Sequence, residues 1–466
     1  MTLEQVARAT GGRVVAPADG LVVDRVATDT RVLGGDPGTL FIALRGERFD
    51  GHDHAAAAAA AGVRALLVAR EVDVPLPQVV VADTTRALAD LAAAAQDGRT
   101  GTVVAITGSN GKTSVKALAL SILQRVGNAY ANPGNRNNEI GLPLAVIDAP
   151  EDADFAIYEM GAGQPGDIAV LTAVVRPDVA LVNNIAPAHL ERMGSLLGVA
   201  DTKAAIYDAL PAGGVAVINA DDAFAPFFAE RAHGRTLLRF GIEASADIRA
   251  RGIRADAAGS RFVLAAPQGE AEVVLALPGR HNVRNALAAA SLALAAGATL
   301  ADVVAGLQAA RAVAGRLVAH RLRNGATLVD DSYNANPGSL QAAIETLASS
   351  GAEAWLVLGD MRELGQDATA LHAEAGRQAR AAGIARLYAL GSLAGEAART
   401  FGDGGRVFER HEALVDALAG DIAAEAPPAQ ANRGLTVLVK GSRGSAMDRI
   451  VAGLLASHGK GDADAA

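Results

Sequence analysis

A short stretch in the first third of the chain, ITGSNGKTS at residues 106–114, has the residue types of a phosphate-binding loop. Its backbone N–H groups could hold phosphate, Lys112 could reach the β- and γ-phosphate oxygens of ATP, and the Thr113 hydroxyl could bind Mg²⁺. In the common form of this loop the first glycine lies further from the Gly-Lys-Ser/Thr triplet than Gly108 lies from Gly111. The alternative is therefore an ordinary glycine-containing turn with a solvated lysine.

The segments on either side of this stretch favour the phosphate loop. TVVAIT (102–107) has the β-branched residues of a strand, and residues 112–126 carry apolar side chains at 115, 118, 119, 122 and 123, the spacing of a helix. A loop between a strand and a helix N-terminus offers unpaired N–H groups and the helix dipole to an anion. We therefore predict a short phosphate loop for ATP, formed by Gly108, Ser109, Asn110, Gly111, Lys112 and Thr113.

Two more polar residues follow predicted strands of the same segment. Glu159 comes directly after DFAIY, and His189 lies in the loop that follows DVALVNNI. The carboxyl ends of parallel strands meet at one edge of a sheet, so both side chains could join Thr113 around Mg²⁺. Each also has a plain alternative, as a surface glutamate or a structural histidine. Lys203 lies on a predicted helix after this loop, either as a solvated lysine or as a carbamate that bridges metal.

The length and the rhythm of the chain indicate several α/β domains. A chain of 466 residues is too long for one core. From Thr102 onward, short β-branched runs alternate with helical runs, which predicts βα units and a mainly parallel sheet. Breaks near residue 98 and at residues 311–316 divide the chain, so we expect domains over residues 1–98, 99–314 and 315–466. The alanine run at 55–61 is predicted to be a helix.

Charge and composition exclude several classes of function. The net charge is -9, with 42 lysine and arginine residues against 51 acidic residues and no basic tract, so no nucleic-acid partner is expected. The absence of cysteine removes disulfides, thiolate metal sites and cysteine nucleophiles. No apolar run approaches the roughly 20 residues of a membrane span, and the N-terminus does not read as a signal peptide. We therefore expect a cytoplasmic protein without membrane insertion.

Six segments occur in an order that is typical of one enzyme family: TGSNGKTS, YEMGA, NNIAPAHLERMGS, LPGRHNVRNALAAASLAL, AGRL and DDSYNANPGSL. The chain resembles the Mur ligases, the ATP-dependent amide-forming enzymes of peptidoglycan precursor synthesis, over nearly its whole length. The resemblance implies a small α/β N-terminal domain for the UDP-sugar and a central ATPase domain of the P-loop type with a mostly parallel sheet. It also implies a Rossmann-like C-terminal domain for the incoming dipeptide.

Further segments resemble the branch of the family that adds D-alanyl-D-alanine. They lie at residues 28–62 and 132–146 and, near the C-terminus, in VLGDMRELG and VKGSRGSAMDRIV. This resemblance implies that UDP-N-acetylmuramoyl-tripeptide and D-alanyl-D-alanine are joined, with ATP and Mg²⁺, through an acyl phosphate. Because the reactants come from separate domains, we expect the domains to close on binding, and we expect a monomer. The third residue of the tripeptide, diaminopimelate or lysine, stays open.

The resemblance also implies roles for single residues. Asn282 is similar to the family's adenine-side asparagine, Arg316 to the arginine that reaches the γ-phosphate, and Asp331 to the hinge aspartate near the ribose. From the residues alone, Asn282 could instead cap a helix, and Asp331 could hold its own loop. The segment DDSYNANPGSLQAAIETL predicts a strand, a loop and a helix with Pro337 in its first turn. The predicted catalytic residues are Lys112, Glu159, His189 and Arg316.

Substrate-binding residues are implied in the N-terminal, central and C-terminal parts. Those similar to the family's uridine-nucleotide-sugar site are Thr30, Arg31, Arg48, Asp50, Gly51 and His52. Asparagines that could bind sugar or peptide amides, or else shape turns, are Asn135, Asn137, Asn138, Asn334 and Asn336. Lys440 and Arg443, predicted on a glycine-containing loop before a helix, could bind the dipeptide carboxylate, or the loop could be an ordinary surface loop.

Two positions depart from the family pattern. Met193 stands where an aromatic residue is usual, and Lys203 is followed by Ala-Ala rather than Gly-Glu, which weakens the carbamate interpretation. Two other functions stay open. One is another amide ligase of the superfamily, such as the tripeptide-forming enzyme or folylpolyglutamate synthetase, against which the D-alanyl-D-alanine segments count. The other is a nucleotide-sensing or scaffold protein that binds ATP without ligation. The presence of Lys112, Thr113, Glu159 and His189 counts against it, because a pure binder would not need residues for a metal ion.

Overall fold

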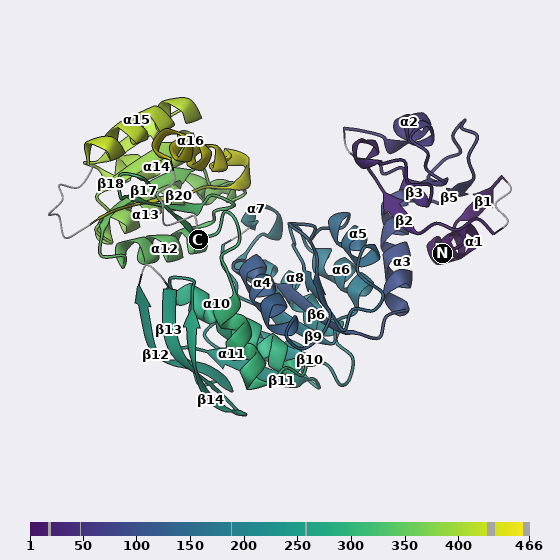
Figure 1. The fold of residues 1–466 in the computed structure, drawn as a ribbon, viewed down its shortest axis with the longest axis horizontal. Helices are drawn as coiled ribbons and strands as arrows, with labels where there is room; N and C mark the ends of the chain where they lie inside the picture. The colour runs from purple at the N-terminus through teal and green to yellow at the C-terminus, as the bar shows by residue number, and fades with distance from the viewer. Residues whose placement is uncertain (17–19, 47, 188, 257–258, 426–433, 460–466) are drawn as a thin grey trace.

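The computed structural model describes residues 1–466 apart from 17–19, 47, 188, 257–258, 426–433 and 460–466. Within the described residues, the strands form three separate sheets of five, nine and six strands. Figure 1 shows the first and the last sheet at opposite ends of the molecule, with the nine-stranded sheet between them. The predicted α/β fold with three domains is confirmed, whereas the boundaries expected after residues 98 and 314 stay predictions.

The first sheet has the order β1-β5-β4-β3-β2 and is parallel except for β1. The elements are α1 (Leu3–Thr10), β1 (Arg13–Val15), β2 (Arg25–Ala27), β3 (Thr39–Ile42), α2 (Ala55–Ala60), β4 (Ala65–Val68), β5 (Gln78–Val80) and α3 (Thr84–Asp97). The alanine run is helical in α2, as predicted. Helix α3 places Leu88 and Leu91 in the core of this sheet and Ala92 in a core of the next, so it joins the two.

The second sheet has the order β14-β13-β12-β11-β10-β9-β6-β8-β7, parallel from β7 to β12 and antiparallel from β12 to β14. Its strands are β6 (Thr102–Thr107), β7 (Ala129–Ala131), β8 (Phe155–Glu159), β9 (Val179–Val182), β10 (Val215–Asn219), β11 (Thr236–Gly241), β12 (Ile248–Asp256), β13 (Gly259–Ala266) and β14 (Gly269–Leu275). In the parallel register Ile106 lies beside Glu159, and Thr107 lies beside Val182. The polar residues that end or follow these strands therefore lie at one edge of the sheet, as predicted.

Helices cover both faces of this sheet. They are α4 (Lys112–Leu123), α5 (Gly141–Ile147), α6 (Asp167–Val175), α7 (Leu190–Met193), α8 (Leu196–Asp208), α9 (Ala225–Arg231), α10 (Arg280–Ala295) and α11 (Leu300–Ala309). Along β6, Val104 and Ile106 pack with α4 and α10, while Val103 and Ala105 pack with α6 and α8. Helix α4 buries every predicted apolar position, but it ends before residue 126 because residues 124–126 form a tight terminal turn.

The third sheet has the order β15-β16-β20-β17-β18-β19 and is parallel except for β15. The elements are β15 (Val318–Arg321), β16 (Thr327–Asp331), α12 (Pro337–Ala348), β17 (Glu353–Gly359), α13 (Ala368–Ala381), β18 (Arg386–Leu390), α14 (Ser392–Phe401), β19 (Gly405–Phe408), α15 (His411–Ala424), β20 (Leu435–Lys440) and α16 (Asp448–His458). The strand, loop and helix predicted around Pro337 are β16, residues 332–336 and α12. Asp331 and Lys440 end neighbouring strands side by side.

Candidate active site

The phosphate loop lies between β6 and α4, as predicted. Gly111 immediately precedes α4 and has the left-handed φ of +78°. A Cβ atom at this position would lie 2.4 Å from Oδ1 of Asn285 and 2.7 Å from Nδ2 of Asn183. Position 111 therefore requires glycine both for its backbone angle and for its close neighbours.

We expect Gly111→Ala to weaken ADP binding by at least about tenfold. The added methyl group would displace Asn183 and Asn285, and a loss of about 1.4 kcal/mol in binding free energy is enough for a tenfold change in affinity. Gly234→Ala is the matched control, because Gly234 has φ +80° and no atom lies within 4 Å of an added Cβ. Both variants should lose about 1 kcal/mol of stability from the left-handed backbone. Calorimetry of ADP binding, with denaturant unfolding, checks this. Equal nucleotide affinity in the two variants would contradict the assigned role of the loop.

Two asparagines directly after β9 hold the phosphate loop. The carbonyl oxygen of Asn184 accepts from the N–H of Ser109 at 2.9 Å, and its Oδ1 accepts from the N–H of Asn110 at 2.8 Å. Nδ2 of Asn183 donates to the carbonyl oxygen of Asn110 at 2.9 Å. These contacts fix the loop in advance of any nucleotide. Sequence reasoning missed both asparagines, although their place directly after a predicted parallel strand was a signal that could have found them.

Side chains from three segments meet at the threonine of the loop. The Thr113 hydroxyl donates to Oε2 of Glu159 at 2.9 Å and accepts from Nη2 of Arg316 at 2.9 Å. Glu159 ends β8, and Arg316 lies between α11 and β15, in the segment that leads into the third sheet. The structure thus places Glu159 and Arg316, two of the residues predicted for catalysis, within hydrogen-bond distance of the same hydroxyl, that of Thr113.

The carboxylate of Glu159 is buried, with 3% of the residue exposed, and it lies among cations. Nζ of Lys116 lies 3.3 Å from its Oε2, and Nδ2 of Asn137 donates to its Oε1 at 2.9 Å. Burial alone would raise the pKa of Glu159, but the charges of Lys112, Lys116 and Arg316 and the hydrogen bond from Thr113 together lower the pKa below its ordinary value. The carboxylate is therefore ionised at neutral pH and available as an oxygen ligand.

Lysine is rare in this chain, and the described lysines gather at one place. The sequence holds five lysines, of which Lys460 lies outside the described residues. Nζ of Lys116 donates to the carbonyl oxygens of residues 132 and 134 besides its contact with Glu159. The remaining three line one cavity: Lys112, Lys203 and Lys440. This scarcity was a sequence signal that could have identified Lys116, which sequence reasoning missed.

His189 and Glu363 connect the central and C-terminal parts. His189 immediately precedes α7, and its Nδ1 lies 2.5 Å from Oε2 of Glu363, in the segment that follows β17. Both residues have positive φ angles, +54° and +62°, which are uncommon for residues with a side chain. Burial lowers the pKa of His189, and the Glu363 carboxylate opposes this effect. His189 thus lies at the predicted site, but with an acidic partner that the sequence did not reveal.

Lys203 lies on α8, as predicted, but only 2% of the residue is exposed. Burial and the charge of Lys112 lower the pKa of Lys203 to about 7, while Asp167 opposes them. Within the described part of the chain, Lys203 makes no ion pair or hydrogen bond, and it lines the cavity. The interpretation as a solvated lysine is therefore wrong. A neutral amine can react with carbon dioxide, so the carbamate alternative stays a prediction.

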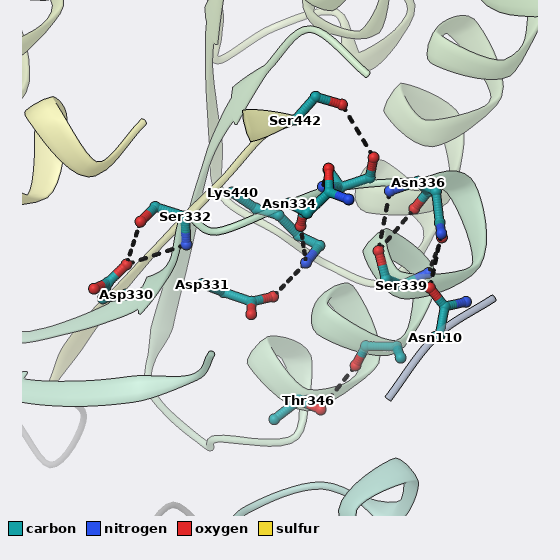
Figure 2. A network of polar contacts seen from close by, with 12 residues as sticks. Asn110, Asp330, Asp331, Ser332, Asn334, Asn336, Ser339, Thr346, Lys440 and Ser442 are labelled. Atoms are coloured by element: carbon teal, nitrogen blue, oxygen red, sulfur yellow. Dashed lines mark hydrogen bonds and ion pairs between the residues drawn. The ribbon is translucent and has the colours of Figure 1, made fainter. Parts of the chain in front are cut away.

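The loop after β16 brings the C-terminal part to the phosphate loop. Figure 2 shows Lys440 reaching Asp331 and Asn334, with its Nζ 2.6 Å from Oδ2 of Asp331 and 3.0 Å from the carbonyl oxygen of Asn334. Lys440 was expected on a loop, but it is buried at the end of β20, because this strand pairs with β16 up to Asp331. Its Nζ is paired with Asp331 in this structure, and its role at the dipeptide carboxylate stays a prediction. Nδ2 of Asn336 donates to Oδ1 of Asn110 at 2.7 Å.

Three more of the predicted asparagines differ in what they contact. Oδ1 of Asn138 accepts from the N–H of Gly141 at 2.9 Å, at the start of α5, which is the turn-shaping use. Nδ2 of Asn282 donates to the carbonyl oxygen of Pro278 at 2.8 Å, and helix α10 has no side-chain cap, so the capping alternative for Asn282 is wrong. Asn135 is exposed and lines the cavity.

The residues predicted for the UDP-sugar lie in the first domain, outside this cavity. Nη2 of Arg31 lies 2.7 Å from Oδ2 of Asp29. Gly51 and His52 are buried, and the His52 ring nitrogens lie 2.5 Å from Oδ1 of Asp50 and 2.8 Å from a main-chain N–H. His52 therefore supports its loop and is not exposed as a direct ligand. The half-buried or exposed members of the predicted set include Thr30, Arg31 and Arg48.

A cavity of about 950 Å³ joins these groups. All residues predicted for ATP and the metal ion line it, and so do the predicted substrate residues Asn135, Asn137, Asn138, Asn334, Asn336 and Lys440. Arg443 begins a short 3-10 helix, Arg443–Ser445, and is not among the lining residues. The volume lies at the upper end of the about 300–1,000 Å³ of ligand sites. It suits a nucleotide beside a second reactant.

Comparison with known proteins identifies the family of this chain. Three family models match: "Mur ligase family, catalytic domain" over residues 25–98, "Mur ligase middle domain" over 106–293, and "Mur ligase, glutamate ligase domain" over 315–443. The UDP-N-acetylmuramoyl-tripeptide--D-alanyl-D-alanine ligase of Escherichia coli (strain K12) is 43% identical, over 97% of this chain and 98% of the relative. The enzyme of that name from Haemophilus influenzae is 39% identical, over 92% and 93%.

Solved structures give the same result. A crystal structure of MurF from Acinetobacter baumannii matches with a TM-score of 0.91 and 33% identity, over 98% of both chains. MurF ligase from Thermotoga maritima in complex with ADP matches with a TM-score of 0.82 and 27% identity, over 94% of this chain and 98% of that one. With the phosphate loop, its carboxylate and the arginine that joins them in one cavity, this chain belongs to the Mur ligase family.

Proposed function

We propose that this chain is an ATP-dependent amide ligase that joins D-alanyl-D-alanine to UDP-N-acetylmuramoyl-tripeptide, giving UDP-N-acetylmuramoyl-pentapeptide, ADP and phosphate. The observation that carries the proposal is the contact between Arg316 and Thr113 of the phosphate loop. Arg316 lies just before β15, where the C-terminal part begins. This contact completes a set of loop, lysine, carboxylate and arginine that suits phosphoryl transfer. Relatives named for this reaction, at 43% and 39% identity, support the choice of substrates.

The phosphate loop is proposed to hold and polarise ATP. Its N–H groups and the N-terminus of α4 attract the phosphates. Nζ of Lys112 donates to the carbonyl oxygen of Gly108 at 2.7 Å, inside the loop. Together with Arg316 it keeps positive charge beside the transferring phosphoryl group, which is the main catalytic need. The match to a MurF ligase in complex with ADP supports this use of the site.

The donor set at Thr113 suits Mg²⁺. Oγ1 of Thr113 and Oε2 of Glu159 are hard oxygen ligands 2.9 Å apart, and no group of three acidic, histidine or cysteine side chains placed to hold a metal occurs among the described residues. Mg²⁺ commonly uses one or two protein oxygens with phosphate oxygens and water. When bound, the ion would supply positive charge beside the phosphates of ATP. We propose His189 as a further ligand once its contact with Glu363 opens.

Amide formation requires an activated acyl group. A carboxylate oxygen of the tripeptide attacks the γ-phosphorus, the bond from this phosphorus to the bridging oxygen breaks, and an acyl phosphate and ADP form. The amine of D-alanyl-D-alanine then attacks the acyl carbon, the bond to the phosphate oxygen breaks, and the nitrogen loses a proton. The protein's part is to place these groups within reach of one another beside Lys112 and Arg316 and to exclude water.

The substrates are proposed to bind on separate domains that close. We assign the UDP-sugar to the first domain through Thr30, Arg31 and Arg48, and the dipeptide carboxylate to Arg443 in the third. Figure 1 shows these domains at opposite ends of the molecule, so the reactants must be brought together. Small-angle scattering should show a smaller radius of gyration with both substrates and a non-hydrolysable ATP analogue than without them. Identical dimensions would contradict closure.

The cellular location and the oligomeric state are further parts of the proposal. Among the described residues, no helix is both long and apolar enough to cross a bilayer. We propose a monomer that acts in the cytoplasm, where ATP is available. Sedimentation at working concentration checks the first part, and a dimer there would contradict it.

An acceptor assay tests the proposed function. ADP release and product mass are measured with UDP-N-acetylmuramoyl-tripeptide, ATP and Mg²⁺ and, in turn, D-alanyl-D-alanine, diaminopimelate, lysine, glutamate or no amine. Only D-alanyl-D-alanine is expected to support turnover, with a product heavier by one dipeptide unit. Turnover with another amine alone would mean that the chain is a ligase of the same family with a different amine substrate. ATP binding without turnover on any amine would favour the nucleotide-binding alternative.

A further inference from the structure

The guanidinium of Arg316 is held by neutral groups. Its Nη2 donates to the Thr113 hydroxyl at 2.9 Å, and its Cζ lies 4.5 Å from the centre of the Tyr333 ring. In the described part of the chain, no carboxylate forms an ion pair with it. An arginine that serves a phosphate must stay in place while its charge stays available. The face of an aromatic ring meets both needs, because it attracts the cation without neutralising it.

Tyr333 is fixed against the backbone beside Arg316. The N–H of Tyr333 donates to the carbonyl oxygen of Gly315 at 3.1 Å. A Cβ atom added at Gly315, where φ is +71°, would lie 3.1 Å from Cβ of Tyr333, so the two segments approach closely. This backbone contact keeps Cα and Cβ of Tyr333 beside the residue that precedes Arg316.

The loop that carries Tyr333 is anchored at both ends. On one side Asp331 pairs with Lys440 at 2.6 Å, and on the other Asn336 donates to Asn110 at 2.7 Å (Figure 2). Residues 332–336 thus form a bridge from the third sheet to the phosphate loop. The side chain of Tyr333 is the part of this bridge that contacts Arg316.

The same ring also adjoins the arginine proposed for the dipeptide. Cζ of Arg443 lies 5.8 Å from the ring centre of Tyr333. One aromatic side chain therefore contacts a cation on the phosphoryl side, Arg316, and a cation on the acceptor side. We propose that Tyr333 is a positioning residue that sets Arg316 for phosphoryl transfer. The inference rests on the proposed function.

A double-mutant cycle tests this inference. Steady-state rates of ADP release are measured for wild type, Tyr333→Leu, Arg316→Ala and the double variant, with unfolding curves to confirm that each is folded. Tyr333→Leu is expected to lower kcat by about tenfold and to change the KM for ATP by less than about threefold, since Arg316 is displaced while the phosphate loop is intact. In the Arg316→Ala background the same change should lower kcat by less than about twofold, because the two effects act through one group.

Two conservative variants separate the ring from the hydroxyl and from local structure. Tyr333→Phe keeps the ring and is expected to recover most of the kcat that Tyr333→Leu loses, whereas Tyr333→Met, which also lacks a ring, should resemble Leu. Equal losses in the wild-type and Arg316→Ala backgrounds would overturn the inference, as would a Phe variant as slow as Leu. If wild type itself fails to turn over D-alanyl-D-alanine, the proposed function fails. If wild type is active and the cycle is additive, only this inference fails.

Discussion

The Lys112→Ala variant is expected to lose about 10²- to 10³-fold in kcat, because it removes a preorganised charge from the transferring phosphoryl group. Nζ of Lys112 lies 2.7 Å from the carbonyl oxygen of Gly108, inside the loop. The neighbouring cations cannot replace it. Lys116 is bound to Glu159 and to backbone oxygens, and Arg316 approaches the phosphoryl group from the segment before β15, on the side of Thr113. The measurement is the steady-state rate of ADP release at saturating substrates, with ADP affinity from calorimetry.

Arg311→Ala is the matched control for this variant. Arg311 lines the same cavity, but its Nη1 donates to the carbonyl oxygens of residues 309 and 310 at 2.9 and 3.1 Å, at the end of α11. The charge of Arg311 therefore stabilises the C-terminal end of α11, and Arg311→Ala is expected to lower kcat by less than about threefold. Full turnover in Lys112→Ala, or equal losses in both variants, would refute the assignment of Lys112.

The Lys203→Met variant is expected to be more stable than wild type by about 2–4 kcal/mol at pH 7, because a buried ammonium without a partner is replaced by an apolar chain. The pKa of Lys203 is about 7 in the folded protein against 10.5 ordinarily. Below pH 7 the amine is protonated in both states, and the full cost of burial applies. Between pH 7 and 10.5 the unfolded chain holds the proton and the folded chain does not. The free energy of unfolding of wild type should therefore rise in this window by about 1.4 kcal/mol per pH unit relative to the variant.

Denaturant unfolding of both proteins between pH 6.5 and pH 9.5, in buffers free of carbon dioxide, measures this difference. Lys116→Met is the control with the opposite sign. Lys116 is buried 3.3 Å from the Glu159 carboxylate, so its removal should destabilise the protein by about 3 kcal/mol. A gap between wild type and Lys203→Met that does not change with pH would contradict the buried, unpaired lysine.

The same lysine gives a direct test of the carbamate. With ¹³C-bicarbonate, wild type is expected to show one protein-bound carbamate carbon by NMR, and Lys203→Met none. The carbamate would lie near the positive charge of Lys112, which favours an anion at this place. A wild-type spectrum identical to that of the variant would leave Lys203 as a buried amine and end the carbamate interpretation.

Local sequence patterns were enough for the phosphate loop and for the elements around it. The apolar spacing of α4 and the glycines of the loop are short-range signals, and Glu159 was found because it directly follows the predicted strand DFAIY. Lys440 shows the limit of this reasoning. Its burial depends on β20 pairing with β16, two strands far apart in the chain, and a single sequence does not show that pairing.

Contacts between domains could not be predicted from the sequence either. The pairing of His189 with Glu363 and of Asn336 with Asn110 joins segments whose spacing says nothing about their distance in space. The surroundings of His52 were out of reach for a related reason. Its place in the uridine-nucleotide-sugar set was implied by the family resemblance and stays a prediction, whereas the contacts of its ring with Asp50 and with a main-chain N–H appear only in the structure. Residues committed to such internal contacts look, in sequence, like residues free to bind a ligand.

The transfer of oxygen from substrate to phosphate tests the central claim most directly. UDP-N-acetylmuramoyl-tripeptide labelled with ¹⁸O in its terminal carboxylate is incubated with ATP, Mg²⁺ and D-alanyl-D-alanine, and the released phosphate is analysed by mass. An acyl phosphate requires that each phosphate carries one ¹⁸O from the carboxylate, with formation of the pentapeptide. Released phosphate without the label would contradict an amide ligase that activates its substrate by phosphoryl transfer at this site.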